Sequence, residues 1–145
     1  MRIVRRYKLD DLPDINKDGK SPIGVVRDAA KEEASHIIDP IDFYCLTVPV
    51  SEATSNGLIN GSDVIATIVR DENSLIVEII NSETSADRTF DCVANEDKPE
   101  DNINCHGRGL LIAKKLLAHI NGTIKFRKKE DVYITTIEVP ASKKI

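Results

Sequence analysis

The sequence predicts an α/β (α+β) two-layer sandwich, in which three helices cover one face of a mixed, mostly antiparallel sheet. Three observations lead to this fold class. Two runs rich in β-branched residues flank a short turn and predict a hairpin. Two segments with helical spacing of apolar residues precede the hairpin, and a third follows it with two further strands. The 145 residues suit a single domain, 1–145, with one core.

The first elements are a strand and a helix. Residues 2–9 are predicted as a short strand, and the polar stretch 10–20 as a loop. Ser21 followed by Pro22 is typical of an N-cap with proline at the first helical position. Apolar residues then recur at helical spacing. We expect this helix to end near Asp39.

The second helix begins with a similar signal, Asp39-Pro40. We expect it to carry residues 43–60 and to end at Gly61, acting as a left-handed C-cap. Pro49 lies inside this range. Proline removes a helical hydrogen bond, so it predicts a kink or a break, and two shorter segments are an alternative.

The second half of the chain is predicted as strands around one long loop and one helix. The loop holds seven acidic residues against two basic ones. A loop of this length in a compact domain is usually functional or mobile. The expected elements are strands over 63–69 and 75–80, an acidic lid-like loop over about 82–106, a helix over 107–120, and closing strands over 123–128 and 133–139.

Composition and charge exclude several classes of function. The formal charge of −4 argues against nucleic-acid binding, and the 4% of aromatic residues argues against stacking on bases. No apolar run is long enough to span a membrane, and the N-terminus lacks an apolar signal core. The three cysteines show no metal-type CxxC spacing. We expect a cytoplasmic protein that binds neither nucleic acid nor membrane.

Polar residues follow one line along the second predicted helix. In the stretch VSEATSNGLING, Glu52, Asn56 and Asn60 are spaced four residues apart and share a helical face. A solvated face explains such a stripe without any function. The alternative is a metal–phosphate site, in which a carboxamide oxygen binds Mg²⁺ and a carboxylate orients or deprotonates an attacking hydroxyl.

A second stretch, HGRGLLIAKKLL, favours the phosphate-binding alternative. It places Gly107, Arg108 and Gly109 at the start of the third predicted helix, directly after the long loop. Glycines let a ligand approach the backbone, and a helix N-terminus presents free N–H groups to anions. A glycine-rich hinge is the simpler explanation of this tripeptide. Its pairing with the Glu/Asn helix is the more informative signal.

The two stretches together resemble a known family. VSEATSNGLING is similar to the N box of the Bergerat-fold (GHKL) histidine-kinase-like ATPases, and GRGLLIAKKLLAHINGTI to their G2 box. The order of elements resembles the serine-kinase anti-sigma factors of bacterial partner switching. The resemblance covers roughly residues 21–140. It implies the same fold, bound ATP and Mg²⁺, and a protein partner.

The resemblance also implies roles for individual residues. Asn56 would bind Mg²⁺, and Glu52 would be the general base toward a serine of the partner. Gly107 and Gly109 would line the triphosphate, and the acidic loop would be the ATP lid. Asn60, Arg108 and Leu110 complete the expected nucleotide-binding set.

The sequence departs from the family at one motif. The family has DxGxG after the second hairpin strand, and its aspartate reads the amino group of adenine. Here the chain reads NSETS, with Asn81 in the aspartate position. The side-chain carbonyl of Asn81 can accept a hydrogen bond from an exocyclic amine. The two glycines that make room for the base are absent.

Three functions are considered for these residues. The first is an ATP- and Mg²⁺-dependent anti-sigma-like serine/threonine kinase, whose partner is a sigma factor or an anti-anti-sigma-like antagonist. The second is a degenerate, non-catalytic module that regulates by protein–protein contact, with a homodimer as one form. A domain that works with a sensor on another chain is a third reading.

Overall fold

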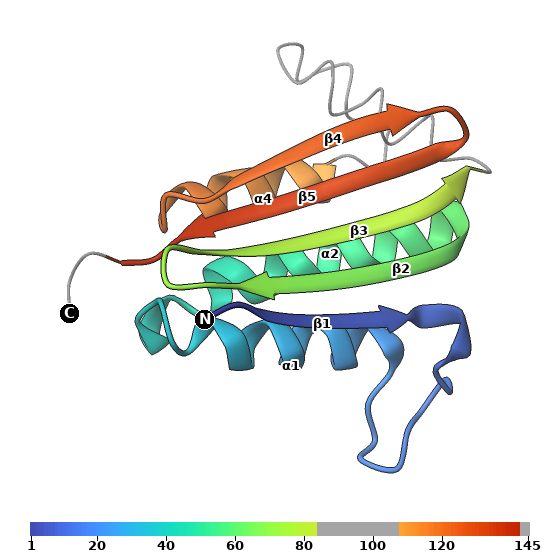
Figure 1. Ribbon diagram of the computed structural model, residues 1–145. Coiled ribbons are helices and arrows are strands. Elements are labelled where there is room, and N and C mark those ends of the chain that lie inside the picture. Colours follow the sequence, from blue (N-terminus) through green and yellow to red (C-terminus); the bar gives the residue numbers. More distant parts are fainter. Residues whose placement is uncertain (84–107, 143–145) are drawn as a thin grey trace.

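A two-layer architecture is seen in the computed structural model, which describes residues 1–83 and 108–142 (Figure 1). One layer is a five-stranded sheet, and helices form the other. The predicted fold class is therefore confirmed. None of the described helices is long and apolar enough to cross a membrane. The elements are β1 (Ile3–Lys8), α1 (Pro22–Ala34), α2 (Tyr44–Asn60), β2 (Gly61–Arg70), β3 (Ser74–Glu83), α4 (Arg108–Ala118), β4 (Thr123–Lys129) and β5 (Val132–Pro140), with 3₁₀ turns at Leu9–Asp11 and Pro40–Asp42.

The sheet has the strand order β1-β2-β3-β5-β4. All four pairings are antiparallel, so the expected mixture of parallel and antiparallel pairs is not found among the described strands. The reason is the number of helices between β1 and β2. With two helices, the chain reverses direction three times and enters β2 antiparallel to β1 (Figure 1).

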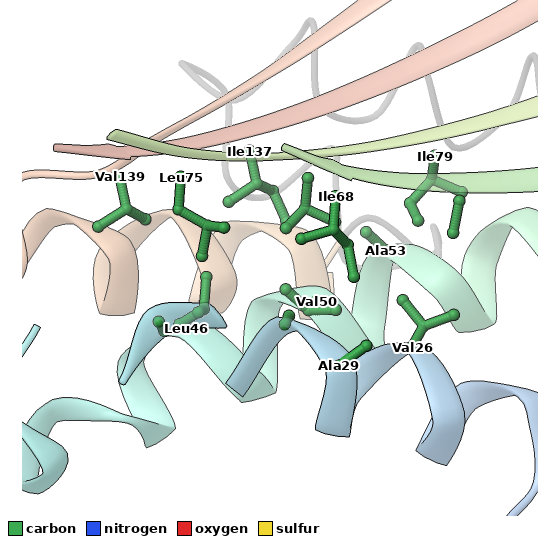
Figure 2. Close-up of a cluster of buried hydrophobic side chains, with 14 of the residues drawn as sticks. Val26, Ala29, Leu46, Val50, Ala53, Ile68, Leu75, Ile79, Ile137 and Val139 are labelled. Atoms are coloured by element: carbon green, nitrogen blue, oxygen red, sulfur yellow. The ribbon is translucent and has the colours of Figure 1, made fainter. Parts of the chain in front are cut away.

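The core lies between the sheet and the helices (Figure 2). Alternate residues of the central strands point into it, as the two-residue period of a strand requires. Ile68, Val77 and Ile137 are examples from β2, β3 and β5, and each is fully buried. On the opposite face, Val4 of β1 remains 54% exposed. The helices thus cover one face of the sheet.

Helix α1 begins as predicted but ends earlier. The side chain of Ser21 accepts a hydrogen bond from the backbone N–H three residues on, so it is the N-cap. The helix ends at Ala34 rather than near Asp39. The N–H groups of Ile37 and Ile38 both bond to the carbonyl of Ala34 at 2.9 Å. This turn places both isoleucine side chains in the core.

Helix α2 is continuous through Pro49. Proline removes one helical hydrogen bond, but packing on several sides of α2 holds the turn together. The predicted start signal belongs to the preceding 3₁₀ turn, where the Asp39 side chain accepts from the N–H of Ile41 at 3.1 Å. The helix itself begins at Tyr44.

Gly61 is not the left-handed C-cap that the sequence suggested. Its φ of −149° and ψ of −174° are extended, and it is the first residue of β2. Glycine is required here because a side chain would have no room. A Cβ on Gly61 would lie 2.5 Å from the carbonyl oxygen of Ser82 and 2.8 Å from Cγ of Asn81. The buried side chain of Asn81 occupies the room that a larger residue would fill.

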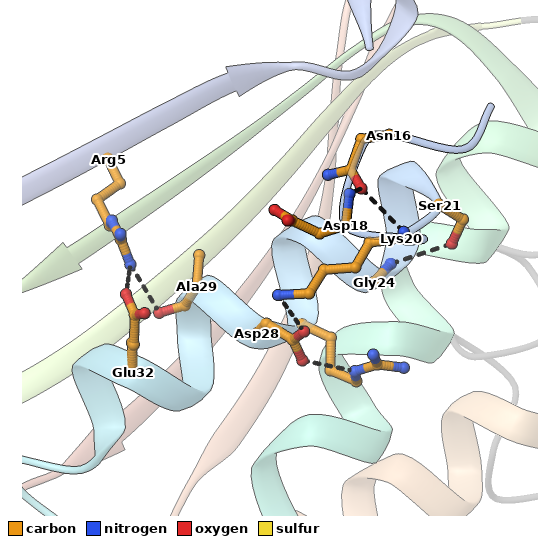
Figure 3. A network of polar contacts seen from close by, with 10 residues as sticks. Arg5, Asn16, Asp18, Lys20, Ser21, Gly24, Asp28, Ala29 and Glu32 are labelled. Atoms are coloured by element: carbon orange, nitrogen blue, oxygen red, sulfur yellow. Dashed lines mark hydrogen bonds and ion pairs between the residues drawn. The ribbon is translucent and has the colours of Figure 1, made fainter. Parts of the chain in front are cut away.

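Polar contacts attach the loop before α1 and the strand β1 to the helix (Figure 3). Nζ of Lys20 lies 2.9 Å from Asp28 Oδ2, and Nε of Arg27 lies 3.0 Å from the other oxygen of Asp28. Arg5 of β1 donates to Glu32 at 2.8 Å. The hydrogen bond from Lys20 is the main cause of a lowered pKa of Asp28, followed in the same direction by the bond from Arg27.

We expect Gly61→Ala to lower the free energy of unfolding by about 1–3 kcal/mol, because the new methyl group overlaps the carbonyl of Ser82. Gly24→Ala, inside α1, is the matched control. A Cβ there would lie 3.4 Å from the end of the Arg27 side chain, 3.6 Å from Cβ of Lys20 and 3.7 Å from Oγ of Ser21, all ordinary contacts, so stability should stay unchanged or rise by up to about 1 kcal/mol. Urea denaturation measures both, and equal losses would contradict the overlap.

We expect Asp28→Asn to reduce stability at neutral pH by less than about 1 kcal/mol, since the pair is partly exposed. The pKa of Asp28 is lower in the folded state than in the unfolded state. Its carboxylate therefore stabilises the fold fully above the usual aspartate pKa of about 4, and this contribution is lost as the pH falls below that value. Thermal unfolding of both proteins across this range should show a difference that disappears in acid. A pH-independent difference would refute the role of the carboxylate.

Candidate functional site

Two polar side chains on the exposed side of α2 are joined to each other. Nδ2 of Asn56 donates a hydrogen bond to Oε2 of Glu52 at 3.1 Å, across one turn of the helix. Both residues are half-buried. Oδ1 of Asn56 receives no hydrogen bond from the described residues. It is a carboxamide oxygen, a type of ligand that Mg²⁺ accepts.

The Glu52 carboxylate packs against the first turn of α4, at Gly109. A Cβ on Gly109 would lie 2.9 Å from Oε1 of Glu52 and closer still to Oε2. Only a glycine lets the carboxylate come this near to the backbone. The N-terminal end of a helix carries partial positive charge, which favours an anion at this place. Tertiary packing of α2 against α4 thus brings together residues 57 positions apart in the chain.

Asn81 belongs to β3 and lies beside α2, nearer to the C-terminal end of that helix than Glu52. Its side chain is 5% exposed and points toward Gly57, the residue that follows Asn56. Nδ2 donates to the carbonyl of Ser82 at 3.2 Å, which leaves Oδ1 as an acceptor facing α2. Within residues 1–83 and 108–142, no group donates to this oxygen. Buried acceptors are rarely left unpaired, so this one fits a ligand that carries an amino group.

The remaining predicted residues are described only in part. Asn60 is the last residue of α2, and Arg108 and Leu110 belong to the first turn of α4, but their side chains lie outside the described part. Gly107 lies outside it altogether, as does most of the predicted lid. Residues 82–83 of that lid are the end of β3. The strand therefore includes Glu83, the position of the first of the family's two glycines, while the second position, residue 85, lies outside the described part.

Sequence reasoning missed a groove between α1 and α2. It has a volume of about 450 Å³ and is lined by Glu52 together with Ile23, Arg27, Thr47, Val48, Ser51 and Ser55. A signal was present in the sequence, because Thr47, Ser51 and Ser55 repeat every four residues and form a hydroxyl stripe on one helical face. No group of three or more His, Cys, Asp or Glu side chains is arranged to hold a metal in the described part of the chain.

The contact between Glu52 and Gly109 can be tested by a double-mutant cycle. Gly109→Ala alone should cost about 1 kcal/mol, because the carboxylate must move. In a Glu52→Ala background the same change should be neutral or stabilising, since alanine favours a helix by about 1 kcal/mol over glycine. Urea denaturation of the four proteins should therefore show coupling of about 1–2 kcal/mol.

A distant carboxylate provides the control for this cycle. Glu72 is exposed in the β2–β3 turn and pairs with the N-terminus. Glu72→Ala and Gly109→Ala should be additive. Additivity of Glu52→Ala and Gly109→Ala as well would contradict the contact.

Comparisons with known proteins add evidence on the fold. No protein-family model and no curated protein matches the sequence. Among solved structures, the chain is similar to the Acinetobacter baumannii histidine kinase AdeS, with 12% sequence identity and a TM-score of 0.54. The match covers 83% of this chain and 63% of that chain. At this identity the likeness concerns the fold alone. The chain has an α+β fold, an antiparallel sheet covered on one face by helices, and shares it with this histidine kinase.

Proposed function

We propose that this chain is an ATP- and Mg²⁺-binding regulatory serine/threonine protein kinase that phosphorylates a small partner protein. One observation carries the proposal. The Glu52 carboxylate is bonded to Asn56 and packs on Gly109 at the start of α4. A candidate base, a candidate metal ligand and an anion-favouring helix end thus share one place.

The residues around this place suit ATP. Oδ1 of Asn81 is a buried acceptor that can bond to the exocyclic amine of adenine. Gly57 and Gly61 have no side chains of their own, which lets the amide of Asn81 lie against the end of α2 and the start of β2. Oδ1 of Asn56 is available to Mg²⁺, which neutralises phosphate charge when bound. These features support binding of the whole nucleotide along α2.

The chemistry assigned to the chain is positioning and proton transfer. Phosphoryl transfer needs little covalent help, so catalysis rests on geometry and electrostatics. Glu52 would orient the serine or threonine hydroxyl of the partner and accept its proton. Asn56 would hold Glu52 in place through the bond at 3.1 Å. The first turn of α4 would present its N–H groups to phosphate oxygens.

The resemblance of the sequence to anti-sigma factors supplies the partner in this proposal. It is a sigma factor or an anti-anti-sigma-like antagonist in the cytoplasm. A homodimer of this chain is the proposed assembly. The fold neighbour is a histidine kinase, and at 12% identity its likeness to this chain concerns the fold and leaves the phosphoacceptor open.

A second candidate is a non-catalytic module that regulates by protein contact. The course of β3 favours it, because the strand continues through Glu83 in place of a glycine turn. A strand there leaves less room for a base than two glycines would. In this candidate Asn81 is a structural residue that fastens β3 to the start of β2.

Calorimetric titration of ATP and ADP with Mg²⁺ tests the first candidate. The wild-type protein should bind, and Asn56→Ala should weaken Mg²⁺-dependent binding about tenfold, or about 1.4 kcal/mol. Glu52→Gln should retain binding. With labelled ATP and a pool of serine-containing peptides, it should transfer phosphate at least about 100-fold more slowly than the wild type.

A matched control and two contrary outcomes complete this experiment. Asn73→Ala changes an asparagine in the exposed β2–β3 turn and should alter neither binding nor transfer. Absence of ATP binding by the folded wild-type protein would favour the non-catalytic module. Binding without transfer to any peptide would exclude the kinase while leaving a nucleotide-binding domain.

A further inference from the structure

The groove between α1 and α2 meets the candidate site at Glu52. Ile23 and Arg27 line it from α1, and four further residues line it from α2. Glu52 also lines the groove while it contacts Asn56 and Gly109 on its other side. A group lying in the groove can therefore reach the same carboxylate that packs on the start of α4.

The lining of the groove suits an extended polypeptide. Such a segment has backbone N–H and C=O groups that need partners. The hydroxyls of Thr47, Ser51 and Ser55 can each donate and accept, and all three face the groove. Ile23 and Val48 provide apolar surface for one side chain of the segment. Val48 is 45% exposed, so its side chain is accessible to an occupant of the groove.

The lining of the groove holds one cation and one anion among the described residues, Arg27 on α1 and Glu52 on α2. Arg27 is the cationic residue of the lining, and its side chain is 45% exposed. Its Nε bonds to Asp28 at 3.0 Å, which leaves the terminal N–H groups of the guanidinium for another acceptor. Beside Arg27, on the α1 side, a glutamate or aspartate of the occupant would be attracted. Beside Glu52 an acidic side chain would be repelled, so a neutral hydroxyl suits that position.

We propose that this groove binds the phosphoacceptor segment of the substrate protein and selects an aliphatic and an acidic residue beside the acceptor serine or threonine. The inference rests on the proposed kinase function and adds its substrate selection. The aliphatic side chain lies on Ile23 and Val48, and the acidic one pairs with Arg27. The acceptor hydroxyl then lies at Glu52.

The transfer step is balanced without further reactants. The hydroxyl oxygen of the segment forms a bond to the terminal phosphorus of ATP. The bond from that phosphorus to the bridging oxygen breaks, and its electron pair stays with ADP. The hydroxyl proton passes to the carboxylate of Glu52, from which it is lost to solvent.

Peptide pools with a fixed central serine test the inference. One flanking position at a time is fixed, the others are degenerate, and labelled ATP with Mg²⁺ reports transfer. The wild-type protein should prefer pools with isoleucine, valine or leucine, and pools with aspartate or glutamate. Val48→Asp should lose the aliphatic preference and raise the KM for the best aliphatic peptide about tenfold, the effect of roughly 1.4 kcal/mol. Its KM for ATP should stay unchanged.

Two further variants make the test specific. Arg27→Gln should lose the acidic preference while keeping the aliphatic one. Val4→Asp is the matched control, because Val4 is 54% exposed and lies on the face of the sheet away from the helices. It should behave as the wild type in both preferences. Thermal unfolding of each variant confirms that it is folded.

The outcomes separate this inference from the kinase proposal. Phosphate transfer without any preference for flanking residues would contradict the assignment of the groove but not the kinase proposal. An unchanged aliphatic preference in Val48→Asp would do the same. A loss in Val4→Asp equal to that in Val48→Asp would also contradict the assignment of the groove. No transfer to any pool by a protein that binds ATP would overturn the kinase proposal, and the groove assignment with it.

Discussion

The position of α2 is the constraint on which the rest of the structure depends. This helix packs against α1 on one side, α4 on the other, and β2 and β3 above it. A helix covered on so many sides is apolar where it meets its neighbours, and α2 buries Leu46, Val50 and Ala53 there. Its outer face carries the polar groups, Glu52 and Asn56 together with the hydroxyl stripe of Thr47, Ser51 and Ser55. The same packing keeps α2 continuous across Pro49, where an isolated helix would bend or break.

Close packing around α2 depends on glycines where backbones and side chains approach each other. Gly109 admits the Glu52 carboxylate to the first turn of α4, and Gly61 admits the side chain of Asn81 to the start of β2. Each glycine is needed because a side chain would not fit, and not because its backbone conformation requires glycine. The result is a row of polar atoms along one helix, with an acid at one end and a buried amide toward the other. Such a row is suited to a ligand with phosphate at one end and a base at the other.

Glu52 lies at the boundary between two environments. Toward α4 it contacts Asn56 and Gly109, where anions are favoured; toward α1 it lines a groove that suits a polypeptide. A general base for phosphoryl transfer needs this position, since it must reach the acceptor hydroxyl while the phosphate is held on the other side. The extension of β3 through Glu83 is the feature that opposes a nucleotide site and favours a binding module.

The sequence by itself determined the fold class, the order of the elements and the shared helical face of Glu52 and Asn56, because these depend on local periodicity and on four-residue spacing. The N-cap at Ser21 followed from local chemistry in the same way. Tertiary structure decided the end of α1 at Ala34, the continuity of α2 and the extended backbone of Gly61, since burial of neighbouring side chains overrides local signals. It also decided which distant residues meet. The approach of Gly109 to Glu52 and the groove beside it arise from helix packing, which no local pattern encodes.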